Sequence, residues 1–388
     1  MQKPVLLLTA TVGVVGSNSL VLSPIAARVA QDLGGVTPSE VMSCAAFYGL
    51  GVALSALFLA PLADRFGADR ALKLALALLA VAFLGSAMAK DVMVLSIAQS
   101  IAGLGAGVAI PALYILAAQI APVGQEARVI GKVLTGWTLS MVGGVTLSAY
   151  VADLAGWRFV YGGLSFGVFT MLAFILRTDW PQVPRATQVT SPLTALRVEG
   201  IGAALLSVGA LGMGFYGVYN FVGSHVVENI GLNVRDVGIL TLFYGAGFAG
   251  AMMFDGMLDR LPVLRSLAVL FGVLAGVYVL FYEFAHSYTF LLAIMPIWGA
   301  LQHLCLNLTI GWLTRLDPNQ RGAIMGLNSA TMYLSVFLGT LLYRPFFESY
   351  GLSAGGAISL LATLVGISVV LNARWQQVRI LRGGDPAA

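Results

Sequence analysis

The stretch from residue 60 to residue 70 reads Ala60-Pro61-Leu62-Ala63-Asp64-Arg65-Phe66-Gly67-Ala68-Asp69-Arg70, and it places four charges between two long apolar runs. The contrast is typical of the whole chain, because 59% of its 388 residues are hydrophobic and only 10% are charged. A soluble domain carries roughly 25% charged residues, so this chain cannot cover a water-facing surface. The composition predicts an integral membrane protein and argues against a soluble protein or an enzyme.

The apolar runs continue along the chain as stretches long enough to cross a membrane. A helix needs about 20 apolar residues to span the hydrocarbon layer, and it must satisfy its backbone hydrogen bonds internally. We therefore expect an all-α membrane protein with twelve transmembrane helices, near residues 5–27, 39–62, 70–89, 92–118, 128–152, 158–176, 199–226, 236–258, 264–284, 288–313, 322–347 and 352–372.

The charged segment has a counterpart in the second half of the chain. Gly256-Met257-Leu258-Asp259-Arg260 follows the eighth apolar stretch, and its Asp-Arg pair comes 195 residues after the first one. The same offset relates Gly131 to Gly326 and Gly144 to Gly339. One offset that holds at three places indicates an internal repeat.

The repeat predicts two pseudo-symmetric six-helix bundles, residues 1–176 and residues 199–388, the second ending in a short cytoplasmic tail. Residues 177–198 form the longest polar stretch and are expected to be a cytoplasmic linker between the bundles. Parallel repeats of this kind place a substrate site between them, near the middle of the membrane.

The basic residues indicate how the chain lies in the membrane. With the N-terminus inside, sixteen Lys and Arg residues fall on the inner side and five on the outer side, namely Arg28, Lys90, Arg158, Arg235 and Arg344. Basic residues concentrate in cytoplasmic loops. We expect a multi-pass protein of the plasma (inner) membrane with both termini in the cytoplasm, surrounded by lipid and acting as a monomer.

The segment at residues 60–70 resembles the loop signature between helices two and three of the major facilitator superfamily. In that family the Asp pairs near a helix end, and the arginines hold neighbouring helices in one state. The resemblance implies a secondary transporter that works by alternating access on a small-molecule substrate. It also implies a conformational latch made of Asp64, Arg65, Arg70, Asp259 and Arg260.

Two further stretches are similar to motifs of that superfamily. Residues 99–107 resemble its helix-four glycine motif. Residues 140–147, which include Gly143 and Gly144 and are followed by Gly156-Trp157-Arg158, resemble the helix-five motif of the drug and sugar efflux branch, the drug:proton antiporter-1 type. The proline usual in that motif is Thr146 here.

The chain departs from that branch where buried charges are common. Many proton-driven members carry an arginine at the position of Gln99 and an acidic residue near Ser19, and both positions are neutral here. An isolated buried charge is costly in a bilayer, so the loss of one partner is best tolerated when the other is also lost. The N-terminal half therefore lacks the usual proton relay, although protons remain a candidate coupling ion.

Polar amides and aromatic rings recur where a central cavity is expected. Tyr and Trp suit stacking on a planar ring or a sugar face, and amides offer donors and acceptors to a neutral solute. Glycines in the seventh span would let that helix bend as a gate. The candidate substrate-binding residues are Asn18, Ser19, Gln99, Trp137, Tyr216, Tyr219, Trp298, Gln302, His303 and Tyr333.

His303 is the ionisable residue nearest the middle of a predicted span. Two interpretations stay open: a neutral histidine that bonds to a neighbour, or a substrate ligand or proton site, since histidine changes charge near physiological pH. Other ionisable residues, such as Asp153, Asp255, Arg344 and Glu348, lie near span ends and are expected to be interface anchors or latches.

The sequence carries no phosphate-binding loop, no metal-ligand cluster and no nucleophile beside a base, so no cofactor, metal, nucleic acid or catalytic residue is expected. Two functions compete: efflux of a drug, sugar or metabolite, favoured by the helix-five motif, and import or facilitated passage of a neutral aromatic metabolite such as a riboflavin-like vitamin or a nucleoside. A non-transporting membrane receptor is a remote third.

Overall fold

The computed structural model describes residues 2–61, 66–122, 124–181, 191–258 and 260–381, and the regular elements in these ranges are all helical. Eleven helical segments of the described chain are long and apolar enough to cross a membrane. The fifth predicted span runs from Glu126 to Leu154, but a five-residue π-helical turn divides it into two shorter helices. With that divided span, the described helices account for the twelve predicted ones.

The elements follow one another in a simple order. They are α1 (Gln2–Leu33), α2 (Pro38–Phe58), α4 (Ala68–Ala87), α5 (Val92–Gln119), α6 (Glu126–Leu139), η1 (Ser140–Gly144), α7 (Val145–Leu154), α8 (Trp157–Leu176), η2 (Pro192–Arg197), α9 (Ile201–Glu228), α10 (Val234–Ala251), η3 (Met252–Phe254), α11 (Asp255–Leu258), α12 (Val263–Phe284), α13 (Tyr288–Leu316), η4 (Pro318–Gln320), α14 (Arg321–Tyr350) and α15 (Leu352–Leu381).

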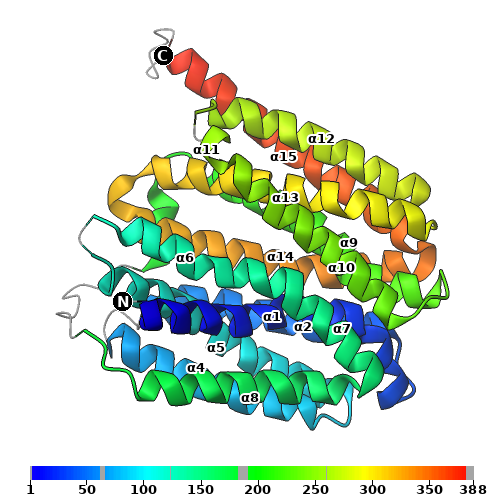
Figure 1. The fold of residues 1–388 in the computed structure, drawn as a ribbon. Helices are drawn as coiled ribbons and strands as arrows, with labels where there is room; N and C mark the ends of the chain where they lie inside the picture. Colours follow the sequence, from blue (N-terminus) through cyan, green and yellow to red (C-terminus); the bar gives the residue numbers. More distant parts are fainter. Residues whose placement is uncertain (1, 62–65, 123, 182–190, 259, 382–388) are drawn as a thin grey trace.

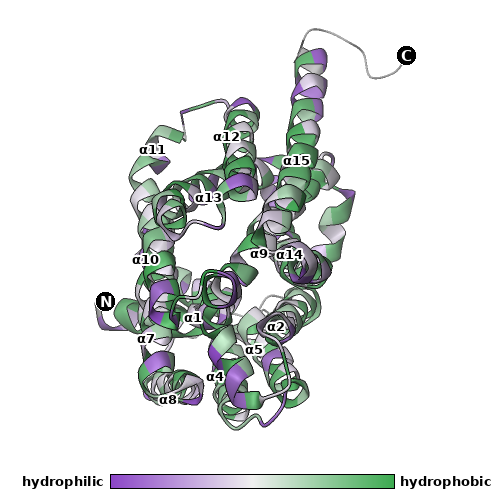
Figure 2. Cartoon of the chain, turned by 90° about the vertical axis from the view of Figure 1, so that its right-hand side faces the viewer, coloured by the Kyte–Doolittle hydropathy of each residue, from purple (hydrophilic) through white to green (hydrophobic). Residues whose placement is uncertain are grey.

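The helices form two packed groups (Figure 1). In the first, α1 to α8, α5 packs against α2 and α4, and α1 packs against α6 and α8. In the second, α9 to α15, α9 packs against α14 and α15, and α10 against α13. Contacts of α2 with α14, of α10 with α7 and η1, and of α1 with α9 join the two groups. The view nearly along the helices in Figure 2 shows the same arrangement, with much of the ribbon apolar.

Two ends of this bundle can be distinguished. The first residues of α1 and the last residues of α15 lie on one side, called the terminal side below (Figure 1). The other side, called the far side, holds the beginnings of α2 and α10. These two helices begin alike: the backbone N–H of Thr37 donates to Glu40, and that of Asn233 donates to Asp236. Such caps satisfy N–H groups that a helix start leaves unpaired.

Glycines set how closely the helices approach. A Cβ added at Gly103 would overlap the carbonyl oxygen of Tyr48, and one added at Gly247 would overlap the backbone of Pro296. Backbones can come this near only where one residue lacks a side chain, which is how small residues support helix packing in membranes. The same reason accounts for Gly217 of α9, where a Cβ would overlap the ring of Tyr343. Gly217 thus makes room for this ring, and bending of α9 as a gate stays a prediction.

Candidate functional site

A chain of neutral side chains crosses the first helix group. Asn18 on α1 donates from Nδ2 to Oε1 of Gln99 on α5 at 2.9 Å, and Gln99 donates from Nε2 to Oγ of Ser86 on α4 at 3.0 Å. All three side chains are buried. The Oδ1 atom of Asn18 is buried without a hydrogen-bond partner among the described residues. Because a buried polar atom is costly when unpaired, this oxygen is a candidate acceptor for a solute.

Ser19, the next residue on α1, takes part in a contact between the two helix groups. Its Oγ lies 3.2 Å from the hydroxyl of Tyr48 on α2. The ring of Tyr48 meets that of Tyr333 on α14 edge to face, with the centroids 6.3 Å apart. Ser19 and Tyr333 therefore lie on opposite sides of the boundary between the groups, and both contact Tyr48.

Three of the predicted aromatic residues meet in the second helix group. Phe215 on α9 is the common neighbour, with ring centroids 4.8 Å from Tyr216, 5.0 Å from Tyr219 and 5.4 Å from Trp298 on α13. Tyr244 on α10 stacks on Phe215 at 5.5 Å. Tyr219 and Trp298 are at most 1% exposed. In this conformation the cluster is packed ring against ring.

Gln302 holds one edge of this cluster. Its Nε2 and the Nε1 of Trp298 both donate to the hydroxyl of Tyr278 on α12, at 3.2 and 3.4 Å. Gln302 therefore has a partner within its own helix group. Trp137 lies apart from the cluster and packs on Gly16 of α1.

His303 forms a hydrogen bond with a partner that the sequence did not reveal. Its Nε2 lies 2.8 Å from Oδ1 of Asp255 at the start of α11. Asp255 was expected to be a span-end anchor; it is instead the partner of His303, because α10 and α13 pack side by side. The His303 side chain is 11% exposed and that of Asp255 34%, so the carboxylate is the more accessible of the two groups.

A line of rings connects this pair to the aromatic cluster. Phe248 on α10 meets the imidazole of His303 edge to face at 4.8 Å, and its ring lies 6.4 Å from that of Tyr244. A displacement of the cluster would therefore be felt at the His303 imidazole through two ring contacts, since packed interiors transmit strain.

The helix-five motif coincides with the π-helical turn. Gly143 and Gly144 are the last two residues of η1. A Cβ at Gly144 would come within 2.5 Å of Oγ of Ser17 on α1, whereas Gly143 faces open space. Across the group boundary, a Cβ at Gly245 of α10 would approach Val142 at 3.0 Å. Single π-helical turns inside α-helices are frequent at functional sites.

Most of the predicted latch lies outside the described residues, namely Asp64, Arg65 and Asp259. Arg70 at the start of α4 and Arg260 before α12 are both exposed. The latch therefore stays a prediction.

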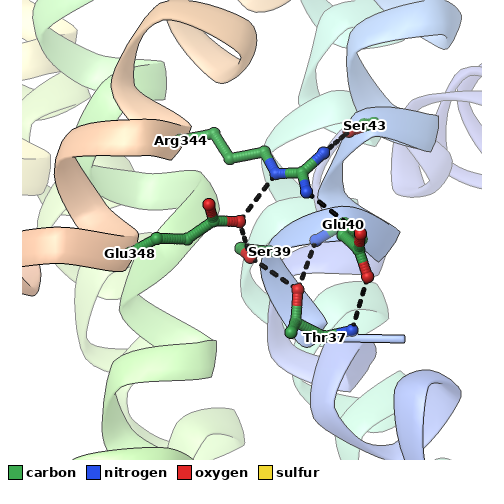
Figure 3. A network of polar contacts seen from close by, with 6 residues as sticks. All are labelled: Thr37, Ser39, Glu40, Ser43, Arg344 and Glu348. Atoms are coloured by element: carbon green, nitrogen blue, oxygen red, sulfur yellow. Dashed lines mark hydrogen bonds and ion pairs between the residues drawn. The ribbon is translucent and has the colours of Figure 1, made fainter. Parts of the chain in front are cut away.

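The far side carries a clamp between the two groups (Figure 3). Arg344 on α14 donates from Nη2 to Glu40 on α2 at 3.2 Å and from Nε to Glu348 on its own helix at 2.8 Å. Ser39 donates to Glu348 at 2.7 Å. A second ion pair between the groups joins Arg235 on α10 to Asp153 on α7.

Replacing Arg344 with glutamine should loosen the far side. An exposed ion pair contributes about 0.2–1 kcal/mol, so losing the contact to Glu40 across the group boundary should shift the conformational balance by about 1.4- to fivefold. Spin labels at Gln31→Cys and Tyr350→Cys would report the separation. Arg158→Gln is the matched control, because Arg158 pairs with Asp32 inside the first group; an equal shift there would contradict the assignment of the clamp.

Comparison with known proteins identifies the family of this chain. The sequence profile of the Major Facilitator Superfamily matches residues 7–340. An uncharacterised MFS-type transporter of Bacillus subtilis, YwfA, is 26% identical over 93% of this chain and 89% of its own length. A probable sugar efflux transporter of Helicobacter acinonychis is 25% identical over 81% of this chain and 82% of its own length.

A solved structure agrees in fold. The inward-open xylose transporter XylE of E. coli superposes with a TM-score of 0.70 at 17% identity, covering 93% of this chain and 94% of that one. Together with the profile match, the apolar spans show a multi-pass membrane transporter of small solutes: the chain belongs to the Major Facilitator Superfamily.

Proposed function

We propose that the chain exports a small uncharged polar solute across the inner membrane in exchange for protons. Residues 1–176 and 199–388 act as two rocking bundles around a site near the midplane, in a monomer whose terminal side faces the cytoplasm. The distribution of Lys and Arg, sixteen against five, supports this orientation. The export direction is supported by the helix-five motif in η1 and by the similarity to a probable sugar efflux transporter.

We infer an uncharged solute from the neutral side chains that run from Asn18 through Gln99 to Ser86. They offer an unpaired amide oxygen and hold no charge. A charged solute would need a countercharge in this low-dielectric setting. Hydroxyl groups of a sugar or a similar metabolite would satisfy the Asn18 oxygen without one.

His303 and Asp255 are proposed to carry the coupling proton. His303 lies about 22 Å along α13 from its far-side start at Tyr288, counting 1.5 Å per residue, and so near the middle of this span. Ionisable pairs inside membrane spans commonly mark proton pathways. Asp255 is the more accessible member, so we expect the pair to exchange its proton through this carboxylate.

Passage of a neutral aromatic metabolite is the second candidate, and one observation favours it. The cluster of Phe215, Tyr219, Tyr244 and Trp298 presents ring faces and edges that could stack on a planar ring once the packed cluster opens. Uptake of riboflavin or uridine without a pH gradient would select this alternative.

Proteoliposomes with an imposed pH gradient test the proposal. Labelled xylose, uridine and riboflavin serve as neutral probes, and succinate serves as the charged one. We expect gradient-dependent transport of a neutral probe and none of succinate. Gln99→Leu should lower transport about tenfold, because a buried donor left unpaired costs about 1–3 kcal/mol. Gln119→Leu, at the end of the same helix, is the control. Succinate transport would contradict the neutral site.

A further inference from the structure

Two lateral grooves on the outside of the bundle occupy repeat-related positions. The first, of about 570 Å³, lies between α1, η1 with its flanking helices, and α8; its lining includes Leu6, Gly13, Gly136 and Gly163. The second, of about 590 Å³, lies between α9, α14 and α15. Gly136 in the first groove corresponds to Thr331 in the second with the 195-residue offset, and Leu6 corresponds to Gly202 with an offset of 196.

The first groove faces the membrane and runs along it. Leu6, Leu147 and Phe159 on its lining are 63–70% exposed, which in a bilayer means exposed to lipid. Along α1 the lining extends from Leu6 to Val21, or about 22 Å at 1.5 Å per residue. The hydrocarbon layer is about 30 Å thick, so the groove is long enough for the acyl chain of a lipid whose headgroup lies at the terminal side.

The charges at the terminal-side mouth distinguish the two grooves. Lys3 lies one helical turn before Leu6. Lys132 lies one turn before Gly136, and its carbonyl oxygen accepts a hydrogen bond from Oγ1 of Thr9 in the lining. Arg128 lies one turn further. All three cations are exposed, and Glu126 supplies a carboxylate at the start of the helix that carries Arg128 and Lys132.

The second groove lacks these cations at its corresponding positions. Lys3, Arg128 and Lys132 correspond to Glu199, Ala323 and Leu327. Arg374 on α15 lies nine residues beyond Val365, or about 13 Å past the end of the lining. The shared fold therefore does not require cations at these three positions, and of the two grooves only the first carries them there.

We propose that the first groove binds an anionic phospholipid, with an acyl chain between α1, α7 and α8 and the phosphate headgroup at Lys3, Lys132 and Arg128. Each basic residue near an anionic lipid surface contributes about a fivefold gain in binding. The neighbouring helices α1, α7 and α8 are visible side by side in Figure 2. Such a lipid would contact η1 directly, because Ser140 and Gly144 belong to the lining.

Native mass spectrometry of the full chain released from nanodiscs tests this site. The discs contain equal parts of phosphatidylglycerol and phosphatidylethanolamine. The wild-type chain should retain phosphatidylglycerol preferentially. Lys3→Gln with Lys132→Gln should reduce that preference about 25-fold, at about fivefold per lysine. This charge variant leaves the packed core unchanged.

A filling variant tests the groove itself. Gly163→Leu places a side chain where nothing lies within 4 Å, so it should displace the lipid without a clash. Gly202→Leu fills the second groove under the same condition and is the matched control. Loss of phosphatidylglycerol in Gly163→Leu but not in Gly202→Leu supports the proposal. Equal loss in both, unchanged retention in Gly163→Leu, or equal retention of the two lipids by the wild type would overturn it.

Discussion

Asp255→Asn should abolish proton-driven transport while leaving gradient-free exchange of the solute in place. Asparagine keeps the shape of the side chain and can still bond to the imidazole of His303, so the fold around α11 should persist. It removes the ionisable carboxylate that lies 2.8 Å from the imidazole. The proton would then lose its site, and solute movement would no longer depend on the pH gradient.

The measurement is a pair of proteoliposome assays on one preparation: transport driven by an imposed pH gradient, and counterflow without a gradient. His303→Gln should behave like Asp255→Asn, since each removes one member of the same pair. Glu228→Gln, an exposed carboxylate at the far-side end of α9, is the control and should keep both activities. Proton-driven transport that survives in Asp255→Asn would refute a proton site at this pair.

Gly247→Val should destabilise the second helix group more than any surface change in the same helix. A Cβ at Gly247 would overlap the backbone of Pro296, and the reciprocal Gly299 packs on the carbonyl oxygen of Tyr244. Backbone atoms cannot move aside by a change of rotamer, as side-chain atoms can, so α10 and α13 must separate. Overpacking costs typically about 1–3 kcal/mol, and this contact belongs at the upper end, which corresponds to a fall in Tm of about 10 °C.

Gly250→Val is the matched control, because the Cβ added there meets nothing within 4 Å and lies on the same helix. Thermal ramps followed by size-exclusion chromatography would compare the two variants. Separation of α10 from α13 would also move Asp255 away from His303, so Gly247→Val should lose proton coupling along with stability. Equal Tm values for the two variants would show that the close approach of the backbones is not needed.

The membrane spans could be predicted because local hydropathy alone identifies them. The π-helical turn at η1 could not, since one extra residue in a turn leaves the apolar pattern unchanged. The contact between Gly217 and the ring of Tyr343 could not be predicted either, because it depends on how α9 packs against α14.

The candidate site was predicted as one set of polar and aromatic residues, and in the structure these residues fall into separate groups. Asn18 and Gln99 could be paired only after α1 and α5 were seen in contact. Phe215 brings Tyr216, Tyr219 and Trp298 together, yet it gives no stronger indication in the sequence than any other phenylalanine. His303 was identified from its depth, but Asp255 was placed at a span end, because adjacency across 48 residues depends on how α10 and α13 align.

The far-side ion pairs have a consistent polarity. In both contacts between the groups, the acid belongs to α1–α8 and the base to α9–α15: Glu40 faces Arg344, and Asp153 faces Arg235. The second carboxylate on Arg344, that of Glu348, comes from the same helix. Two copies of the first group would therefore meet acid to acid, and two copies of the second base to base. Expressed as separate chains, the groups should recognise each other and reject themselves, as the subunits of an obligate heterodimer do.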